Sequence, residues 1–160
     1  MTTTVRLATI ADVPEILRMI RALATFERAP DAVKATEASL AEMLFGADPK
    51  VFAHIAEVDG RPAGVAVWFL NFSTWTGRHG IYLEDLFVDP EVRRAGVAGA
   101  LFRALAAEAK VRGCARIDWA VLDWNEDAKH FYRTLGGYHS TGWEPWRLDG
   151  ANLAALQGQP

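Results

Sequence analysis

Hydrophobic and polar residues follow two different periods along the chain, and the changes of period predict the order of the elements. After a short strand, apolar residues three and four apart predict a helix that begins after Asp12, with Pro14 near its start and Glu15 placed to complete a capping box. A second helix is predicted to begin at Thr36. Two β-rich runs then flank Asp59-Gly60, a dipeptide typical of type I′ turns, and predict a hairpin.

The rest of the chain alternates between strands and helices. The pattern predicts a strand over 80–88, a helix that stops at Gly113, a strand over 115–122, a helix capped by Asn125 and a final short strand near 144–149. The first of these strands, the helix after it and the next strand should form a parallel, right-handed crossover. The order predicts an α/β (α+β) protein, in which a mixed central sheet carries helices on its faces.

Composition narrows the class of protein. A chain of 160 residues, 51% hydrophobic and 23% charged, is typical of one globular domain, expected to span 1–160. The net charge of −3 argues against nucleic acid as a partner. A signal peptide and an apolar run of about 18 residues are both missing from the sequence, so no membrane partner and a cytoplasmic location are expected. The four histidines lack metal-ligand spacing, and no metal site is expected.

The single cysteine, Cys114, excludes a disulfide within the chain. It follows the helix-ending Gly113 and has no histidine close in sequence. We therefore interpret it as a buried structural thiol rather than as a catalytic nucleophile.

The segment 93–99, with the sequence RRAGVAG, concentrates arginine and glycine where the helix before Gly113 begins. Glycine costs about 1 kcal/mol relative to alanine inside a helix, so two of them need a reason. The first N–H groups of a helix lack internal partners, and its dipole favours an anion there. Small residues would let a pyrophosphate approach, and the arginines add positive charge. An ordinary tight turn with solvated arginines is the alternative; neither the P-loop nor the dinucleotide pattern fits.

Residues Arg93 to Ala98 match the R/Q-x-x-G-x-G/A motif of the GNAT acetyltransferase superfamily. Segments 82–102 and 120–137, together with Trp146 to Leu148, resemble its diamine and thialysine N-acetyltransferase branch, and the resemblance covers nearly the whole chain. It implies the GNAT fold, with acetyl-CoA between two splayed parallel strands around 83–88 and 117–122. It also implies a homodimer and a primary-amine substrate.

The resemblance gives one strand and the turn after it a role in cofactor binding. The strand backbone would pair with the pantetheine arm, and the turn would hold the pyrophosphate. Asn125 is equally well explained as a helix cap or as a cofactor contact. The expected cofactor-binding residues are Leu86, Phe87, Val88, Arg93, Arg94, Ala95, Gly96, Val97, Ala98, Gly99 and Asn125.

Acetyl transfer to an amine requires a proton acceptor and an acid for the leaving thiolate. The resemblance implies Tyr132 as the acid, although helical spacing alone favours a core tyrosine. Glu84 is the expected base, acting through water. Strict alternation puts Tyr82 and Glu84 on one face of the strand and Asp85 on the other, so only Glu84 should face the cleft unless a bulge intervenes. A structural ion pair with an arginine is the alternative explanation of these acids.

A second group of residues is expected to bind the amine substrate: Glu27, Asp31, Ser73, Trp75, Asp85 and Trp146. Glu27 and Asp31 could hold a distal ammonium or belong to a solvated loop. The two tryptophans could shape the pocket or belong to the core. Ser73 stands where an acid would suit a polyamine, and its hydroxyl favours a smaller, amino-acid-like amine.

The expected function is an acetyl-CoA-dependent N-acetyltransferase that acts on a small primary amine by direct attack in a ternary complex. One alternative is a CoA-sensing or partner-binding domain without chemistry, and the presence of both Glu84 and Tyr132 argues against it. The other is an N-acetyltransferase of peptides or proteins. The acidic segment 26–31 and the tryptophans favour an enclosed pocket over the open groove that a peptide needs.

Overall fold

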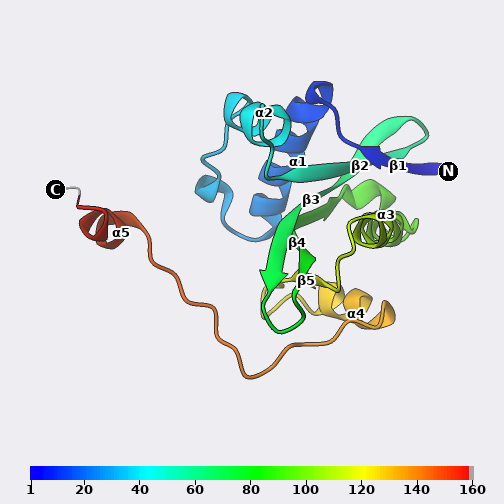
Figure 1. Cartoon of the computed structure of the whole chain (residues 1–160). Coiled ribbons are helices and arrows are strands. Elements are labelled where there is room, and N and C mark those ends of the chain that lie inside the picture. The colour runs from blue at the N-terminus through cyan, green and yellow to red at the C-terminus, as the bar shows by residue number, and fades with distance from the viewer. Residues whose placement is uncertain (159–160) are drawn as a thin grey trace. The chain divides into compact units, whose positions relative to one another are not determined.

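A five-stranded sheet with the order β1-β2-β3-β4-β5 organises the first 122 residues of the computed structural model (Figure 1). The strands are β1 (Thr3–Leu7), β2 (Phe52–Val58), β3 (Arg61–Ser73), β4 (Arg78–Val88) and β5 (Ile117–Trp119). Neighbours from β1 to β4 are antiparallel, whereas β4 and β5 are parallel. The prediction of a mixed sheet with a parallel connection is confirmed.

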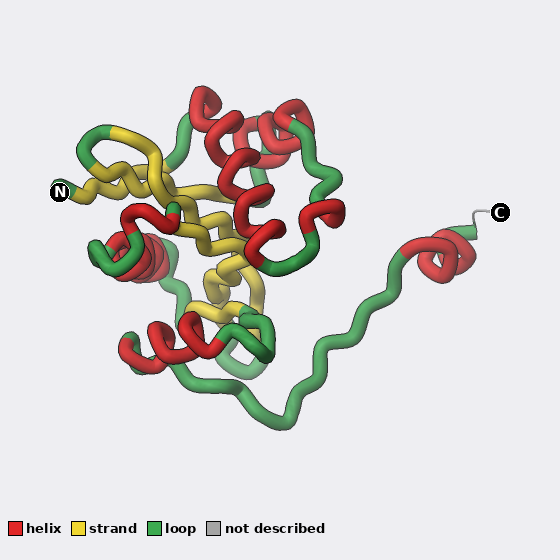
Figure 2. The backbone as a smooth tube through the Cα atoms, turned by 180° about the vertical axis from the view of Figure 1, so that it is seen from behind, coloured by secondary structure: helices red, strands yellow, loops and turns green. Residues whose placement is uncertain are grey.

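The chain is described from residue 1 to 158 and forms two units, the first ending at Leu122 and the second beginning at Asp123. The helices of the first unit are α1 (Val13–Phe26), α2 (Glu37–Phe45) and α3 (Val97–Val111), with short 3₁₀ turns at Ile10–Asp12, Pro30–Ala32 and Pro90–Val92. Helices α1 and α2 cover one face of the sheet and α3 the other (Figure 2). Among the helices of residues 1–158, none has the length and apolar character needed to cross a membrane.

The core between the sheet and α1 is made of fully or nearly fully buried apolar side chains. Ile16 and Met19 of α1 pack with Val65 and Val67 of β3 and with Phe87 of β4. These contacts fix which residues of β3 and β4 face α1, and the active-site argument depends on that assignment.

On the opposite face, Trp68 is fully buried and stacks on Phe52, with ring centroids 4.7 Å apart. Its indole N–H donates to Nδ1 of His54 over 3.0 Å, and burial lowers the pKa of His54. The Arg112 guanidinium lies over the rings of Phe52 and Trp68 and holds the end of α3 to the sheet.

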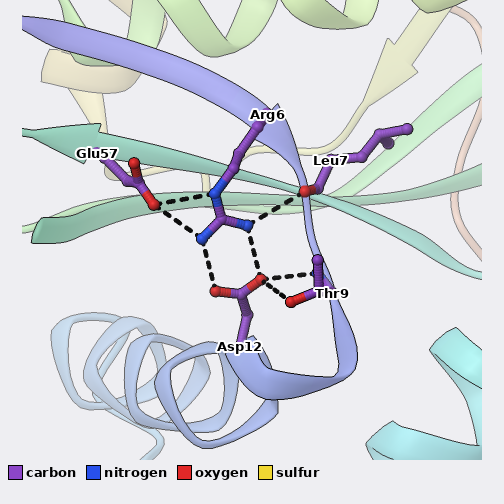
Figure 3. Close-up of polar contacts among 5 residues, drawn as sticks. All are labelled: Arg6, Leu7, Thr9, Asp12 and Glu57. Carbon is purple, nitrogen blue, oxygen red and sulfur yellow. Dashed lines mark hydrogen bonds and ion pairs between the residues drawn. The ribbon is translucent and has the colours of Figure 1, made fainter. Parts of the chain in front are cut away.

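The predicted capping box at the start of α1 is wrong, because the carboxylate of Asp12 accepts hydrogen bonds from Arg6 and Thr9 instead. Two nitrogens of Arg6 donate to Asp12 over 2.7 and 2.8 Å, and the backbone N–H of Thr9 donates over 2.7 Å (Figure 3). Arg6 also donates to Glu57 of β2 over 2.9 Å. These bonds, led by the one from Arg6, lower the pKa of Asp12 to about 2. Glu15 instead pairs with Arg18.

Other local turn and cap predictions are confirmed. Thr36 caps α2, and Asp59 and Gly60 have φ angles of +49° and +78°, as a type I′ turn requires. In the second unit, Oδ1 of Asn125 accepts the N–H of Ala128 over 3.2 Å and caps α4 (Glu126–Thr134).

Predictions that required a strand partner are less accurate. Strand β5 ends at Trp119 rather than at residue 122. The strand predicted near 144–149 is not formed: these residues pair with no strand in the described chain, and a helix, α5 (Gly150–Leu156), follows instead. A strand exists only where a second strand satisfies its backbone groups, which local alternation cannot supply.

Candidate active site

Strands β4 and β5 run side by side over a short length only. Ile81 to Leu83 pair with Ile117 to Trp119. From Asp85 to Val88, β4 pairs with β3 on one side, and the described residues provide no strand on the other side. This open edge presents backbone N–H and C=O groups to any extended ligand that carries amide groups. The splayed strands expected from the sequence are confirmed.

The turn after β4 supplies a second row of free backbone donors. Helix α3 begins at Val97, and the described residues provide no acceptor for its first N–H groups, those of Val97, Ala98 and Gly99. Just before the helix, Arg94 and Gly96 have left-handed φ angles of +69° and +76°. Left-handed residues before a helix curve the backbone so that N–H groups converge into an anion site. The turn therefore fits a pyrophosphate.

Two arginine contacts tie α1 to this turn. Arg18 donates two hydrogen bonds of 3.0 Å to Asp89, at the end of β4. Arg93 places its guanidinium 5.2 Å from the ring centroid of Phe26 and donates from Nε to the carbonyl of Val88 over 3.4 Å. Sequence reasoning missed Arg18 and Phe26, since their partners lie far along the chain.

A β-bulge at Glu84 changes which side chains of β4 share a face. Val67 pairs with Asp85, whereas the next residue, Trp68, pairs with Leu83, so Glu84 is the extra residue. Paired side chains lie on one face, and Val67 faces α1. Asp85 therefore faces α1 as well, together with Tyr82, which pairs with Phe69. The prediction that Asp85 and Tyr82 lie on opposite faces is wrong.

Glu27 and Glu84 both act electrostatically on Asp85, and the three carboxylates have no cation partner among the described residues. Glu84 is exposed, Asp85 is half-buried, and Glu27 follows the last residue of α1. Among residues 1–158, no arginine, lysine or histidine forms an ion pair with any of the three, so the alternative of a structural ion pair is not observed. Burial, followed by the charges of Glu84 and Glu27, raises the pKa of Asp85 to about 6. Burial also raises the pKa of Glu27.

Near the part of β4 that pairs with β5, Asp118 has hydrogen-bond partners and the pKa of Tyr82 is raised. Asp118 of β5 accepts from Arg116 over 2.7 Å and from Asn71 over 3.0 Å. Burial, together with Glu84 and Asp118, raises the pKa of Tyr82. Tyr82 therefore remains protonated and can donate a hydrogen bond on the face that carries Asp85.

Ser73 and Trp75, also predicted to bind substrate, lie apart from the carboxylates, whereas Asp31 follows Glu27 closely in the chain. Asp31 is exposed on the 3₁₀ turn after α1. Ser73 lies about 20 Å along β3 from Val67, the partner of Asp85, at about 3.4 Å per residue. Its hydroxyl accepts the N–H of Thr76 and supports the hairpin turn. Trp75 on that turn is 88% exposed, so it is not a core residue.

The second unit holds the remaining predicted residues. Tyr132 is half-buried on α4, with its ring centroid 5.5 Å from that of Phe131. The side-chain oxygen of Asn125 is engaged by the helix cap. Trp146 is 90% exposed and is not a core residue.

Cys114 and the histidines add no reactive or metal centre to the described chain. Cys114 is half-buried, and burial raises the pKa of its thiol, which opposes a nucleophilic thiolate. Within residues 1–158, no group of three or more His, Cys, Asp or Glu side chains could hold a metal ion.

Strands β4 and β5 part after a short parallel pairing, and α3, which follows β4, begins with free N–H groups that fit an anion. This arrangement is the one expected of acetyltransferases built on the GNAT fold. Residues 15–137 match the acetyltransferase (GNAT) family, and the chain belongs to that family as an N-acetyltransferase. Enzymes of this type generally use acetyl-CoA.

Relatives agree in family and fold. The chain is 38% identical to a thialysine N-epsilon-acetyltransferase of Sus scrofa, over 97% of each sequence. It is 29% identical to an L-ornithine N5-acetyltransferase of Arabidopsis thaliana, over 95% of the chain and 86% of that protein. Among solved structures, an integron cassette protein from the mobile metagenome of V. cholerae superposes with a TM-score of 0.81 at 24% identity, over 98% of each chain.

Proposed function

We propose that this enzyme transfers the acetyl group of acetyl-CoA to a primary amine of a small molecule: a diamine, a polyamine or a thialysine-like amino acid. The observation that carries the proposal is the group of carboxylates at Glu27, Glu84 and Asp85, which has no cation among the described residues. A substrate ammonium is the cation that such a group would bind. The thialysine and ornithine acetyltransferases to which the chain is similar support this substrate class.

The cofactor proposal rests on the open edge and the turn. When bound, acetyl-CoA supplies an acetyl group activated as a thioester. The N–H groups of Val97, Ala98 and Gly99 would hold the pyrophosphate, with charge added by Arg93 and Arg94. The remaining expected cofactor residues lie on the unpaired edge of β4 and in the turn itself, namely Leu86, Phe87, Val88, Ala95 and Gly96.

A carboxylate accepts the proton of the substrate ammonium, and a tyrosine donates a proton to the leaving thiolate. The ammonium must lose a proton before its nitrogen can attack directly, with both reactants bound together. The acid pair at Glu84 and Asp85 accepts that proton, directly or through water; Glu84 is the member that the sequence predicts. Tyr132 donates a proton from Oη to the departing thiolate, an assignment supported by the resemblance of segment 120–137.

We also propose a homodimer that functions in the cytoplasm. Tyr138, Trp146 and Leu148 of the second unit are 88%, 90% and 51% exposed. Large apolar side chains exposed together on one segment are typical of an interaction surface. A second copy is the partner that the family resemblance implies. Sedimentation equilibrium would test this, and a monomer at assay concentrations would contradict it.

The test of function is CoA release from acetyl-CoA with a panel of diamines, polyamines, thialysine, lysine, ornithine and short peptides. Turnover of one small-amine group supports the proposal. Preference for thialysine or ornithine over spermidine would support the interpretation of Ser73. CoA binding without turnover of any amine would favour the sensing domain, and turnover of peptides alone would favour a peptide N-acetyltransferase.

A further inference from the structure

The two glycines at the start of α3 differ in what the fold requires of them. Gly96 has a φ angle of +76°, which glycine adopts without strain. Gly99 lies inside α3 with ordinary helical backbone, so its conformation does not require glycine. Beyond its chain neighbours and its own helix backbone, a Cβ at this position would meet one atom within 4 Å, Nη1 of Arg103 at 3.5 Å. Since glycine costs about 1 kcal/mol relative to alanine inside a helix, the fold alone does not account for Gly99.

Arg103 brings a guanidinium to the first turn of α3. Residues four apart lie on the same side of a helix, and side chains on a helix lean toward its N-terminus. Nη1 of Arg103 accordingly lies beside Gly99, whose N–H has no acceptor among the described residues. Arg103 is exposed, and no acid of residues 1–158 forms an ion pair with it. Free N–H groups and an unpaired guanidinium therefore meet over a residue without a side chain.

The arginines of the turn are placed differently from Arg103. Arg93 lies against α1, with its guanidinium over Phe26 and its Nε donating to the carbonyl of Val88. Arg94 belongs to the turn itself and has a left-handed φ angle of +69°. Arg103 is the arginine that α3 contributes, on the open side left by Gly99.

We infer that Arg103 binds the 3′-phosphate of CoA, and that this contact makes the enzyme select CoA over dephospho-CoA. The inference rests on the proposed function, in its use of acetyl-CoA. The 3′-phosphate is a monoester with a charge of about −1.5 to −2 at pH 7, and a guanidinium can bind two of its oxygens at once. It is attached to the same ribose as the pyrophosphate. A cation for it must therefore lie close to the N–H groups that would hold the pyrophosphate, as the guanidinium of Arg103 does.

Isothermal titration calorimetry of the full-length protein with CoA and with dephospho-CoA tests the inference without turnover. We expect CoA to bind about tenfold more tightly, the size of one charge-assisted contact at an exposed site. In Arg103→Met the Kd of CoA should rise about tenfold, and that of dephospho-CoA should not change. Lys110→Met is the matched control, because Lys110 is exposed on the same helix about 10 Å further along its axis, at about 1.5 Å per residue. This variant should bind both ligands as the unmodified protein does.

Equal affinity of the unmodified protein for the two ligands would overturn the inference. So would an equal loss of both affinities in Arg103→Met, which would assign Arg103 to the pyrophosphate, or an equal loss of CoA affinity in Lys110→Met, which would show an effect of general charge. Failure of the proposed function looks different: CoA would be selected through Arg103, yet no amine would be acetylated. Acetylation with equal KM values for acetyl-CoA and acetyl-dephospho-CoA would contradict the role of Arg103 and leave the proposed function standing.

Discussion

Two groups of acids in the first unit have opposite electrostatic environments. Asp12 and Glu57 share the guanidinium of Arg6, and the pKa of Asp12 is lowered to about 2 (Figure 3). Burial, followed by the charges of Glu84 and Glu27, raises the pKa of Asp85 to about 6. Among the described residues, the acids that hold the fold together thus have a cation, and the acids proposed to bind a substrate ammonium have none. Uncompensated, half-buried charge is the physical mark of a functional site.

The largest expected effect on kinetics comes from placing a cation in the group of Glu27, Glu84 and Asp85. Glu27→Lys would place an ammonium among the charges that act on Asp85 and would repel the substrate ammonium. We expect the KM of the amine to rise about thirtyfold, the equivalent of roughly 2 kcal/mol. Steady-state kinetics across amine concentrations measures this.

Asp31→Lys is the matched control for Glu27→Lys. It changes the net charge by the same amount at a nearby exposed residue. The charge of Asp31 is not among those that raise the pKa of Asp85. An equal rise of KM in both variants would mean that general charge, rather than the carboxylate group, attracts the substrate.

The converse change removes the Arg6 guanidinium from the group of Asp12 and Glu57. Arg6→Met removes the cation that Asp12 and Glu57 share, which we expect to lower the free energy of unfolding. Since 40% of the Arg6 side chain is exposed, the loss should be about 1 to 2 kcal/mol rather than the larger cost of a fully buried pair. A fall in melting temperature of about 3 to 6 °C corresponds to this loss.

Arg61→Met is the control for the loss of an arginine. Arg61 is exposed at the start of β3, with no ion pair among the described residues. Equal melting temperatures in the two variants would show that the Arg6 network contributes nothing. Activity at 25 °C should be unchanged in both.

The same comparison explains what sequence patterns could predict here. The hairpin turn at Asp59-Gly60, the cap at Asn125 and the helix start at Val97 follow from residues close in the chain, and all are confirmed. The environments of Asp12 and Asp85 depend on distant partners. Arg6 lies across a turn, and the bulge that puts Tyr82 and Asp85 on one face becomes visible only in the register of β4 with β3.

One inserted residue inverts every side chain beyond it, so alternation put Tyr82 and Asp85 on opposite faces of β4 although both face α1. The residues proposed for catalysis and for cofactor binding remain predictions of the same local kind. Motif spacing predicts the turn and the acids. That Asp85 is half-buried whereas Glu84 is exposed follows from packing between distant segments, which spacing does not encode.

The smallest expected effect concerns stability, and its sign distinguishes the two groups of acids. A carboxylate whose pKa is raised by folding contributes stability at pH values below its unfolded pKa near 4, and this contribution is lost as the pH rises through about 6. Asp85 should therefore destabilise the native state at pH 7.5, and Asp85→Asn should raise the free energy of unfolding there by about 1 kcal/mol, with almost no change at pH 4.

Asp12→Asn should do the opposite. The depressed pKa of Asp12 contributes stability above pH 4 that is lost as the pH falls toward about 2, so this variant should be less stable at pH 7.5 and converge with the unmodified protein in acid. Urea denaturation at a series of pH values measures both variants. If Asp85→Asn is destabilised at pH 7.5 as Asp12→Asn is, then a cation neutralises Asp85 in solution, and the contrast between the two groups of acids does not hold.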